Sequence, residues 1–260
     1  MIDKLISRAR EMGIALTRDQ AEKFEIYHRM LIEANAQFNL TRVPEDMDEA
    51  IDRNYLDCIA PLAKGLPEGT RRMIDVGSGA GFPGIPLAIC LPDVHIVLMD
   101  ALTKRVDFLN SVISALKLNA EAVHLRAEDG ARRPELRESF DIATARAVAA
   151  LNLLSEYLLP FVKVGGKMMV LKGPTLDEEL AQAENALSIL GGKFSHEDKI
   201  TIPGRDWDHR VAWIDKVAPT PEKYPRRAGK PETKPLGGGD AGVLPQTPLK
   251  GDLPLRIRRR

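Results

Sequence analysis

The chain has 260 residues, with 37 Lys and Arg against 37 Asp and Glu, and 44% of its residues are hydrophobic. This balance excludes a disordered polyelectrolyte, and because no apolar run approaches the roughly 20 residues of a membrane-spanning helix, we expect no membrane contact. The two cysteines, Cys58 and Cys90, stand in no zinc or disulfide pattern, so we expect no bound metal and a reducing, cytoplasmic compartment.

Helical patterns occupy residues 1–69. A first helix is expected over residues 1–13. Thr17 and Gln20 form a capping box, and apolar residues then recur every three or four positions, which predicts a helix that ends near Asn39-Leu40-Thr41. A further helix is expected over residues 46–62. Together these predict a helical N-terminal extension over residues 1–69.

Short β-rich runs alternate with helical patterns over residues 70–218. Strands are expected at 73–76, 95–99, 121–125, 140–145 and 167–171, with helices near 84–91, 103–118, 149–162 and 176–190. This repetition predicts an α/β domain whose mostly parallel sheet is covered on both faces. Two last runs, 199–202 and 210–217, would add an antiparallel pair at the sheet edge.

Residues 219–260 differ in composition from the rest of the chain. They hold ten Lys or Arg against four Asp or Glu, and eight of the 18 prolines. This composition predicts a basic tail that is mostly extended or disordered. Its cations could pair with phosphates or only favour solubility.

The strongest local signal is a glycine-rich stretch between the first strand and its helix. It reads Asp75-Val-Gly77-Ser-Gly79-Ala-Gly81-Phe82-Pro-Gly84 and matches both a dinucleotide fingerprint and the first motif of S-adenosylmethionine-dependent methyltransferases. An acidic residue beside the loop suits a cofactor with an ammonium and a sulfonium better than one with two phosphates, so Asp75 favours the methyl donor. A tight turn without a ligand is the third interpretation.

Further candidate residues follow the later strands. Asp100 ends the second strand, where a carboxylate would bind the ribose hydroxyls of either cofactor. Ala127 and Glu128 follow the third strand and could flank an adenine, or form an exposed acidic turn. Arg146 and Lys172 end the next two strands, where they could serve as hydrogen-bond and phosphate partners of an RNA substrate. The alternatives are a surface salt bridge for Arg146 and a solvated strand end for Lys172.

The absence of known motifs after the fourth strand narrows the choice of atom that could accept a methyl group. Methylation of an exocyclic amine usually requires an Asp/Asn-Pro-Pro-Tyr/Phe loop, and 5-methylcytosine formation requires a nucleophilic thiol, for which neither cysteine has the Pro-Cys setting. Transfer to an atom with an available lone pair, such as guanine N7, needs no general base and depends on in-line positioning.

Six motifs in order resemble one known family. They are Asn39-Leu-Thr41, the glycine stretch, Lys104-Arg105-x-x-Phe108-Leu109, Ala145-Arg146-Ala147, Lys172-Gly173 and Tyr224-Pro-Arg-Arg-Ala-Gly229. Over about residues 1–236 the chain resembles the bacterial 16S ribosomal RNA guanine-N7 methyltransferases, also called glucose-inhibited division protein B.

The resemblance implies a class I methyltransferase fold, Rossmann-like with a mostly parallel seven-stranded sheet, behind the helical extension. The implied reaction transfers the methyl group of S-adenosylmethionine to N7 of one guanine in 16S rRNA, near the decoding site of the small ribosomal subunit. A monomer is expected. The basic 223–234 segment would contact RNA phosphates together with Lys and Arg of the extension.

The resemblance also implies roles for individual residues. With the motif residues, the expected cofactor site consists of Gly77, Gly79, Gly81, Phe82, Asp100, Ala127, Glu128 and Arg146. The expected catalytic residues are Arg146, Asn39 and Lys172, with Asn35 also facing the active site. The chain departs from the family pattern at Ala34, Asn54 and Cys58, where the family often has Trp, His and Ser.

Two other classes of function stay open on the sequence. A nicotinamide-dependent oxidoreductase could use the overlapping Gly79-x-Gly81-x-x-Gly84 match. A non-catalytic RNA-binding or assembly factor could retain the fold without the reaction.

Overall fold

The computed structural model describes residues 1–38, 40–146 and 149–237. Its main helices are α1 (Ile2–Glu11), α2 (Arg18–Phe38), α3 (Met47–Ala50), α4 (Asp57–Ile59), α5 (Gly84–Cys90), α6 (Thr103–Leu116), α7 (Ala127–Gly130), α8 (Leu151–Leu158), α9 (Leu176–Leu190) and α10 (Lys230–Thr233). The strands are β1 (Arg72–Val76), β2 (His95–Asp100), β3 (Ala120–His124), β4 (Phe140–Arg146), β5 (Val162–Lys172), β6 (Gly192–Ile200) and β7 (His209–Lys216).

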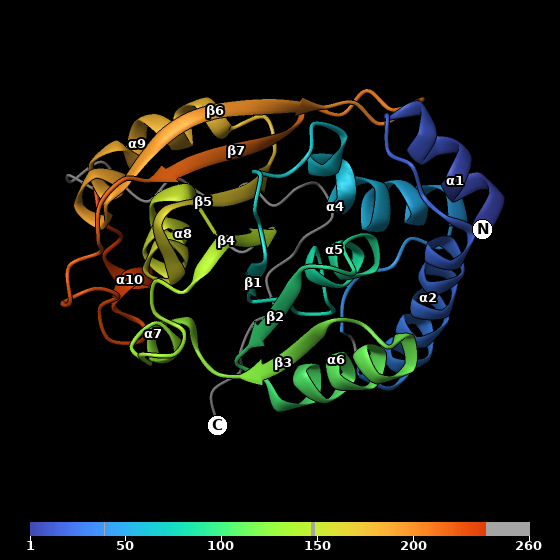
Figure 1. The fold of residues 1–260 in the computed structure, drawn as a ribbon, viewed down its shortest axis with the longest axis horizontal. Helices are drawn as coiled ribbons and strands as arrows, with labels where there is room; N and C mark the ends of the chain where they lie inside the picture. Colours follow the sequence, from blue (N-terminus) through green and yellow to red (C-terminus); the bar gives the residue numbers. More distant parts are fainter. Residues whose placement is uncertain (39, 147–148, 238–260) are drawn as a thin grey trace.

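The strands form one seven-stranded sheet in the order β3-β2-β1-β4-β5-β7-β6 (Figure 1). Strands β1 to β5 pair in parallel with one another, and β7 pairs antiparallel with both β5 and β6. This arrangement is the class I S-adenosylmethionine-dependent methyltransferase fold, and it confirms the expected fold class, including the closing antiparallel pair.

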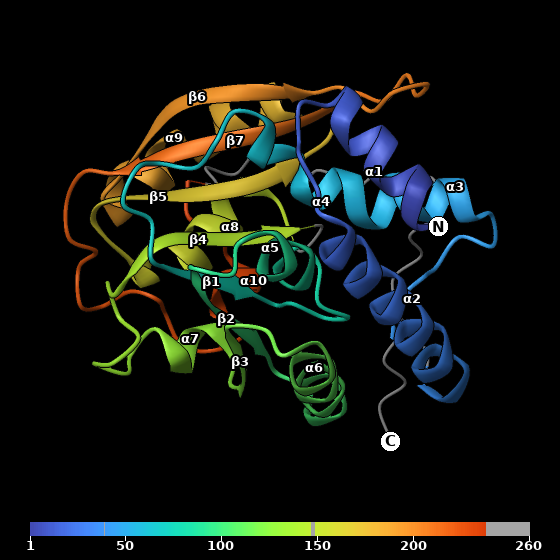
Figure 2. The same cartoon turned by 45° about the vertical axis from the view of Figure 1, so that its right-hand side comes forward.

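The sheet separates two hydrophobic cores. Alternate residues of a strand point to opposite faces, so Met73 belongs to one core and Ile74 and Val76 to the other. Helices α5 and α6 cover the first face together with the N-terminal helices, whereas α8 and α9 cover the second (Figures 1 and 2). No helix among the described residues is long and apolar enough to span a membrane.

The N-terminal helices pack against α5 and share its core (Figure 2). The predicted capping box is present: the Gln20 backbone N–H donates to Thr17 Oγ1 at 3.2 Å, and the Thr17 backbone N–H donates to Gln20 Oε1 at 2.9 Å. The Gln20 side chain also donates to the carbonyls of Ile89 and Cys90, which fixes the start of α2 on the end of α5.

The expected helix over 46–62 is interrupted. Between α3 and α4 the backbone adopts a π-helical segment, Ile51–Leu56, and a 3₁₀ turn, Ala60–Ala63, follows α4. π-Helical turns are rare and often occur at functional sites. This one contains Asp52 and Asn54, which are both buried.

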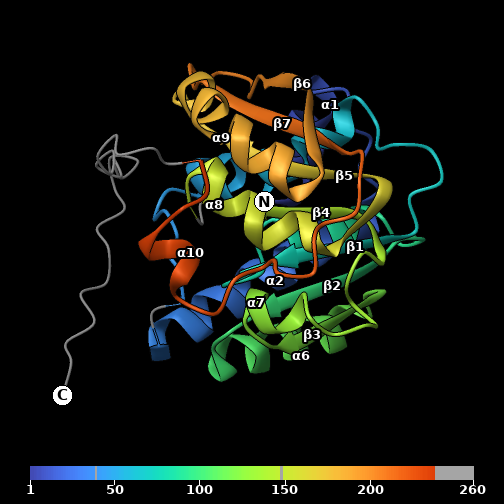
Figure 3. The ribbon, with the colours of Figure 1, turned by 90° about the vertical axis from the view of Figure 1, so that its left-hand side faces the viewer.

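The C-terminal segment differs most from expectation. The tail expected to be mostly extended or disordered was residues 219–260. Of these, residues 219–237 are held in place by side chains of the sheet domain and include α10 (Figure 3), and residues 238–260 lie outside the described residues. Arg137 donates to the carbonyls of Thr220 and Tyr224 at 2.8 and 2.9 Å. The Glu156 carboxylate accepts hydrogen bonds from the backbone and the guanidinium of Arg226. One ion pair and several hydrogen bonds from side chains to the backbone therefore order a segment that has little apolar surface of its own.

Candidate functional site

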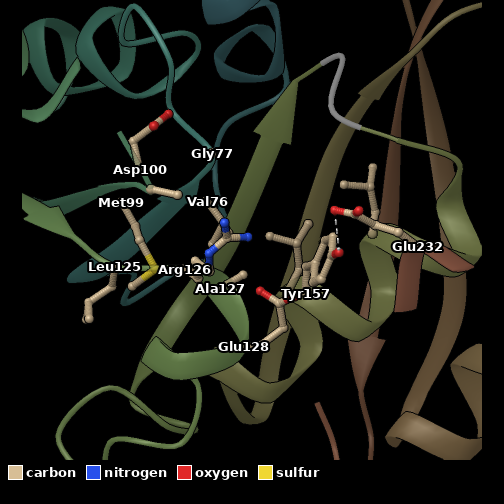
Figure 4. Close-up of a pocket in the computed structure, with 13 residues that line it drawn as sticks. Val76, Gly77, Met99, Asp100, Leu125, Arg126, Ala127, Glu128, Tyr157 and Glu232 are labelled. Carbon is tan, nitrogen blue, oxygen red and sulfur yellow. Dashed lines mark hydrogen bonds between the residues drawn. The ribbon is translucent and has the colours of Figure 1, made fainter. Parts of the chain in front are cut away.

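A pocket of about 150 Å³ lies at the carboxyl ends of β1, β2 and β3, where parallel α/β sheets bind ligands (Figure 4). Four of the predicted cofactor residues line it: Gly77, Asp100, Ala127 and Glu128. The remaining lining residues are Val76, Met99, Ala101, Leu125, Arg126, Leu154, Tyr157, Leu158 and Glu232. Apolar walls with a few carboxylates suit a nucleoside, whose base needs stacking surface and whose hydroxyls need acceptors.

Several backbone N–H groups of the glycine loop donate hydrogen bonds to carbonyls of the protein. Gly77 and Ser78 donate to the carbonyl of Met99 at 2.8 and 3.0 Å, and Gly81 and Phe82 donate to the carbonyl of Ser78. Gly77 has a φ of 76°, in the left-handed region that favours glycine. At Gly81 an added Cβ would lie 2.6 Å from Ile85 Cγ1, so this glycine permits close packing of the loop on α5.

Asp75 lies beneath the glycine loop and does not line the pocket. Its Oδ2 accepts hydrogen bonds from Ser78 Oγ at 2.7 Å and from the Gly84 N–H at 3.0 Å, while its Oδ1 has no partner among the described residues. Burial raises the pKa of this carboxyl to about 7. The expected role of Asp75 as a charge facing the cofactor is therefore wrong; it joins β1 to the start of α5.

The same contact bears on the dinucleotide alternative. In dinucleotide-binding folds the pyrophosphate lies at the amino terminus of the helix after the glycine loop, and free backbone N–H groups bind it. Here the Asp75 carboxylate already accepts the Gly84 N–H at the first residue of α5. This N–H is therefore not available to a pyrophosphate, so the loop does not fit a nicotinamide dinucleotide.

Two buried carboxylates border the pocket. Asp100 Oδ2 accepts the Gly79 N–H at 2.8 Å, and Asp100 Oδ1 accepts the Leu102 N–H at 2.9 Å, which fixes the carboxylate between the glycine loop and the start of α6. Glu128 is 5% exposed, and its Oε1 accepts the Gly229 N–H at 3.3 Å. The expected alternative of an exposed acidic turn applies to Asp129 but not to Glu128.

Sequence reasoning missed two residues of the pocket. Tyr157 on α8 donates its hydroxyl hydrogen to Glu232 Oε1 on α10 at 3.3 Å, and the pair lies on the opposite side of the pocket from Asp100 (Figure 4). They are 75 residues apart and belong to no motif. Only the ordered C-terminal segment brings them together, so no local sequence signal identifies them.

Arg146 and Phe82 form a second group, where the glycine loop faces the N-terminal extension. The Arg146 guanidinium lies over the Phe82 ring, 4.8 Å from its centroid. Its Nη1 donates to the Arg53 carbonyl at 2.5 Å and to Asp57 Oδ2 at 3.4 Å. Both contacts use one nitrogen of a group with five N–H donors. The salt bridge expected as the alternative is therefore present, but it is buried and not at the surface.

Asp57 is a third residue to which the sequence assigned no role. It is 7% exposed, and its Oδ1 accepts a hydrogen bond from His209 Nδ1 at 2.9 Å. The carboxylate thus bridges Arg146 of β4 and His209 of β7. Its position in the Arg53-Asn54-Tyr-Leu-Asp57 stretch, which resembles a family motif, was the available signal.

Lys172 is paired inside the protein. Its Nζ donates to Glu179 Oε2 and to the Ala149 carbonyl, each at 2.6 Å, and its side chain is 9% exposed. Glu179 Oε2 also accepts the Leu151 N–H at 2.8 Å, so the Lys172–Glu179 pair holds the start of α8. These contacts favour a positioning role for Lys172, and its predicted contact with RNA stays a prediction.

Asn39 and Ala147 lie outside the described residues. Asn35 is described: its Oδ1 accepts the Thr41 N–H at 3.1 Å, which fixes the turn after α2.

The two thiols are buried or half-buried, and burial raises the pKa of each to about 12. A thiol with so high a pKa is a poor nucleophile at neutral pH.

Comparison with known sequences gives one consistent match. The family model described as rRNA small subunit methyltransferase G matches residues 20–203. A ribosomal RNA small subunit methyltransferase G of Clostridium perfringens is 45% identical over 226 residues, which is 86% of this chain and 94% of the relative. A protein of the same name from Leuconostoc citreum is 44% identical over 237 residues, covering 90% of this chain and 99% of the relative.

Comparison with solved structures supports the fold. A branched-chain polyamine synthase from Thermus thermophilus, solved with N4-aminopropylspermidine and 5′-methylthioadenosine, superposes with a TM-score of 0.52 at 15% identity. The match covers 77% of this chain and 64% of that structure. At this identity the likeness concerns the fold alone.

Proposed function

The chain belongs to the rRNA small subunit methyltransferase G family, and from this premise we propose that it methylates N7 of one guanine of 16S rRNA near the decoding site. Membership makes it an enzyme that uses S-adenosylmethionine to methylate a guanine of 16S rRNA. The atom, the nucleotide and the residues that act on them are the proposal.

The pocket at the ends of β1–β3 fits the adenosine part of S-adenosylmethionine. Met99, Leu125 and Leu158 provide apolar surface for the base, and the carboxylates of Asp100 and Glu128 provide acceptors for hydroxyl and amine hydrogens. The observation that carries the choice of cofactor is the Asp75–Gly84 contact, which takes up the backbone N–H that a dinucleotide pyrophosphate would require. The bound cofactor supplies a methyl group on a positively charged sulfur.

Arg146 is the residue best placed to position the guanine. It lies beside the glycine loop, over Phe82, and its guanidinium can donate to guanine O6 while N7 remains free to attack. N7 carries a lone pair and no proton, so the transfer requires no general base. The protein accelerates such a reaction by holding donor and acceptor in line, which contributes as much as about 7–11 kcal/mol in favourable systems.

The direct test is methyl transfer from labelled S-adenosylmethionine to 30S subunits that lack the modification. We expect one methyl group per subunit, at guanine N7, identified by mass spectrometry of the digested rRNA. Naked 16S rRNA serves as the second substrate, because the assembled subunit and the free RNA differ in which nucleotides are exposed. A methyl group on any other atom would overturn the proposal.

A second measurement separates catalysis from binding alone. S-adenosylmethionine should raise the melting temperature by mass action, and NAD at the same concentration should not. Stabilisation by S-adenosylmethionine without transfer to either RNA, at any ionic strength, would instead favour the non-catalytic RNA-binding factor.

A further inference from the structure

A second hollow, the basic groove, lies next to the cofactor pocket. It has a volume of about 510 Å³, and its lining residues are Arg132, Lys223, Tyr224, Arg226, Arg227 and Lys230. Arg132 follows α7, and the other five belong to the segment after β7. Five cations and one tyrosine thus meet from two separate parts of the chain, and no carboxylate is among these described lining residues.

The cations of the basic groove are of two kinds. Arg226 serves the fold: its Nη2 lies 2.6 Å from Oε2 of Glu156, a fully buried carboxylate. By contrast, Lys223, Arg227 and Lys230 are exposed, and none forms an ion pair within the part of the chain that the structure describes. The sequence predicted that the 223–234 segment as a whole contacts RNA phosphates. In the structure Arg226 holds the segment on the protein, whereas Lys223, Arg227 and Lys230 are exposed and could bind phosphates.

The fourth available charge comes from outside that segment. Arg132 is exposed, and its Nη2 donates to the Pro225 carbonyl, which holds the guanidinium at the wall of the groove. The Lys223 Nζ lies 5.3 Å from the centroid of the Tyr224 ring. Like charges that line one groove repel one another, and a polyanion in the groove relieves that repulsion.

The basic groove adjoins the cofactor pocket through α10. The Gly229 N–H donates to Glu128 and the Glu232 carboxylate lines the cofactor pocket, so Lys230 lies between two contacts of that pocket. Figure 3 shows α10 close to α8, whose Leu154 and Tyr157 line the cofactor pocket, while Lys230 of α10 lines the basic groove. A chain of phosphates in the groove would therefore run past the opening of the cofactor site.

We infer that the basic groove binds the phosphodiester backbone of the RNA substrate, with Arg132, Lys223, Arg227 and Lys230 as its phosphate partners. The inference rests on the proposed function for the identity of the polyanion. Arginine can bind a phosphate through two parallel hydrogen bonds, and lysine acts as a point charge, so the groove provides affinity without reading base sequence.

The test compares two triple variants that remove the same charge. The groove variant carries Lys223→Gln, Arg227→Gln and Lys230→Gln. The control variant carries Lys64→Gln, Lys193→Gln and Lys199→Gln, which are exposed lysines outside the groove. Binding to unmodified 30S subunits is measured at a series of salt concentrations, together with the KM and kcat of methyl transfer.

We expect the groove variant to lose affinity and salt dependence. Each phosphate contact contributes roughly 0.7–0.9 to the slope of log K against log salt concentration, so three lost contacts should lower the slope by about 2. KM for the subunit should rise about tenfold or more, while kcat, the melting temperature and the affinity for S-adenosylmethionine stay unchanged. A Lys223→Arg, Arg227→Lys, Lys230→Arg variant should keep the native slope.

Two results would overturn the inference. One is a groove variant that binds the subunit as tightly as the native chain does, and the other is an equal loss of affinity in the groove and control variants, which would indicate only the overall charge. Either result can occur while the native chain still methylates the RNA, so the inference can fail while the proposed function stands. Failure of the native chain to methylate RNA would instead reject the proposed function.

Discussion

The carboxyl of Asp75 shows how one residue links the fold to stability. It is fully buried and joins the glycine loop to α5, and burial raises its pKa to about 7, against about 3.9 for an unfolded aspartate. Between these two values the folded chain holds a proton that the unfolded chain has released. The contribution of Asp75 to stability is therefore complete below about pH 4 and declines as the pH rises toward 7.

Asp75→Asn should remove this dependence. We expect the melting temperature of the variant to rise relative to that of the native chain between pH 5 and pH 8, because the asparagine has no proton to release. Differential scanning calorimetry without cofactor measures it. A difference that stays constant over that range would show that Asp75 is ionised throughout.

Arg146 is the residue on which we expect turnover to depend most. Arg146→Ala should lower kcat by roughly 100-fold, in line with the cost of a misplaced reactant, and should leave the fold intact because Asp57 keeps its hydrogen bond to His209. Arg146→Lys should not restore turnover, since an ammonium that binds Arg53 and Asp57 lacks the further N–H donors of the planar guanidinium that would reach the guanine. Arg133→Ala, an exposed arginine, is the control, and unchanged kcat in Arg146→Ala would remove this residue from the site.

Among the elements, the C-terminal segment after β7 depends on one buried ion pair. Arg226→Ala would leave the Glu156 carboxylate unpaired at 0% exposure, which costs about 3–5 kcal/mol when one partner of a buried pair is removed. We expect the melting temperature to fall by roughly 10 °C and the affinity for S-adenosylmethionine to weaken, because Gly229 and Glu232 belong to the same segment.

Arg227→Ala is the matched control for this prediction. Its side chain is exposed, so its effect on the free energy of unfolding should stay within about 0.5 kcal/mol. Equal melting temperatures for the two variants would mean that the segment is not held by Arg226.

The sequence predicts elements well where the hydrophobic pattern is strong. The buried strands and the helices on both faces were predicted to within a few residues, except that β5 begins at Val162 and not near 167. Strand β6 begins at Gly192 and not at 199, because it is an edge strand whose residues are mostly exposed and polar. The single-turn helices α7 and α10 are too short to show a period.

The same limit applies to the candidate site. The glycine loop, Asp100 and Glu128 follow strands in register, so their meeting at one sheet edge is predictable. Tyr157 and Glu232 meet only because the Arg226–Glu156 ion pair and the hydrogen bonds of Arg137 order the C-terminal segment, and no local pattern predicts this.

At the scale of the whole molecule, the β6–β7 hairpin touches the N-terminal extension. The Trp207 ring lies between two guanidinium groups, 4.5 Å from Arg53 and 5.3 Å from Arg205. Arg205 also binds the buried Asp52 at 2.6 Å, and the next strand begins with His209, which binds Asp57. The hairpin, the extension and Arg146 thus form one connected set of contacts.

Trp207→Ala should loosen these contacts together. Two lost cation–π contacts are worth about 1–2 kcal/mol, and we expect faster amide hydrogen exchange in both 51–56 and 203–209, with a lower kcat. Leu102→Ala removes an exposed apolar side chain elsewhere and should change neither. Faster exchange in the hairpin alone would show that the extension does not depend on it.

The anchoring of Arg146 by Arg53 and Asp57 has a consequence for evolution and protein engineering. Consider a chimera that joins the first 69 residues of one relative to the sheet domain of another. Its equivalent of Arg146 would come from one parent, and the equivalents of Arg53 and Asp57, which orient the guanidinium, would come from the other. Recombination at this boundary should therefore yield active hybrids only when the donor carries an aspartate equivalent to Asp57.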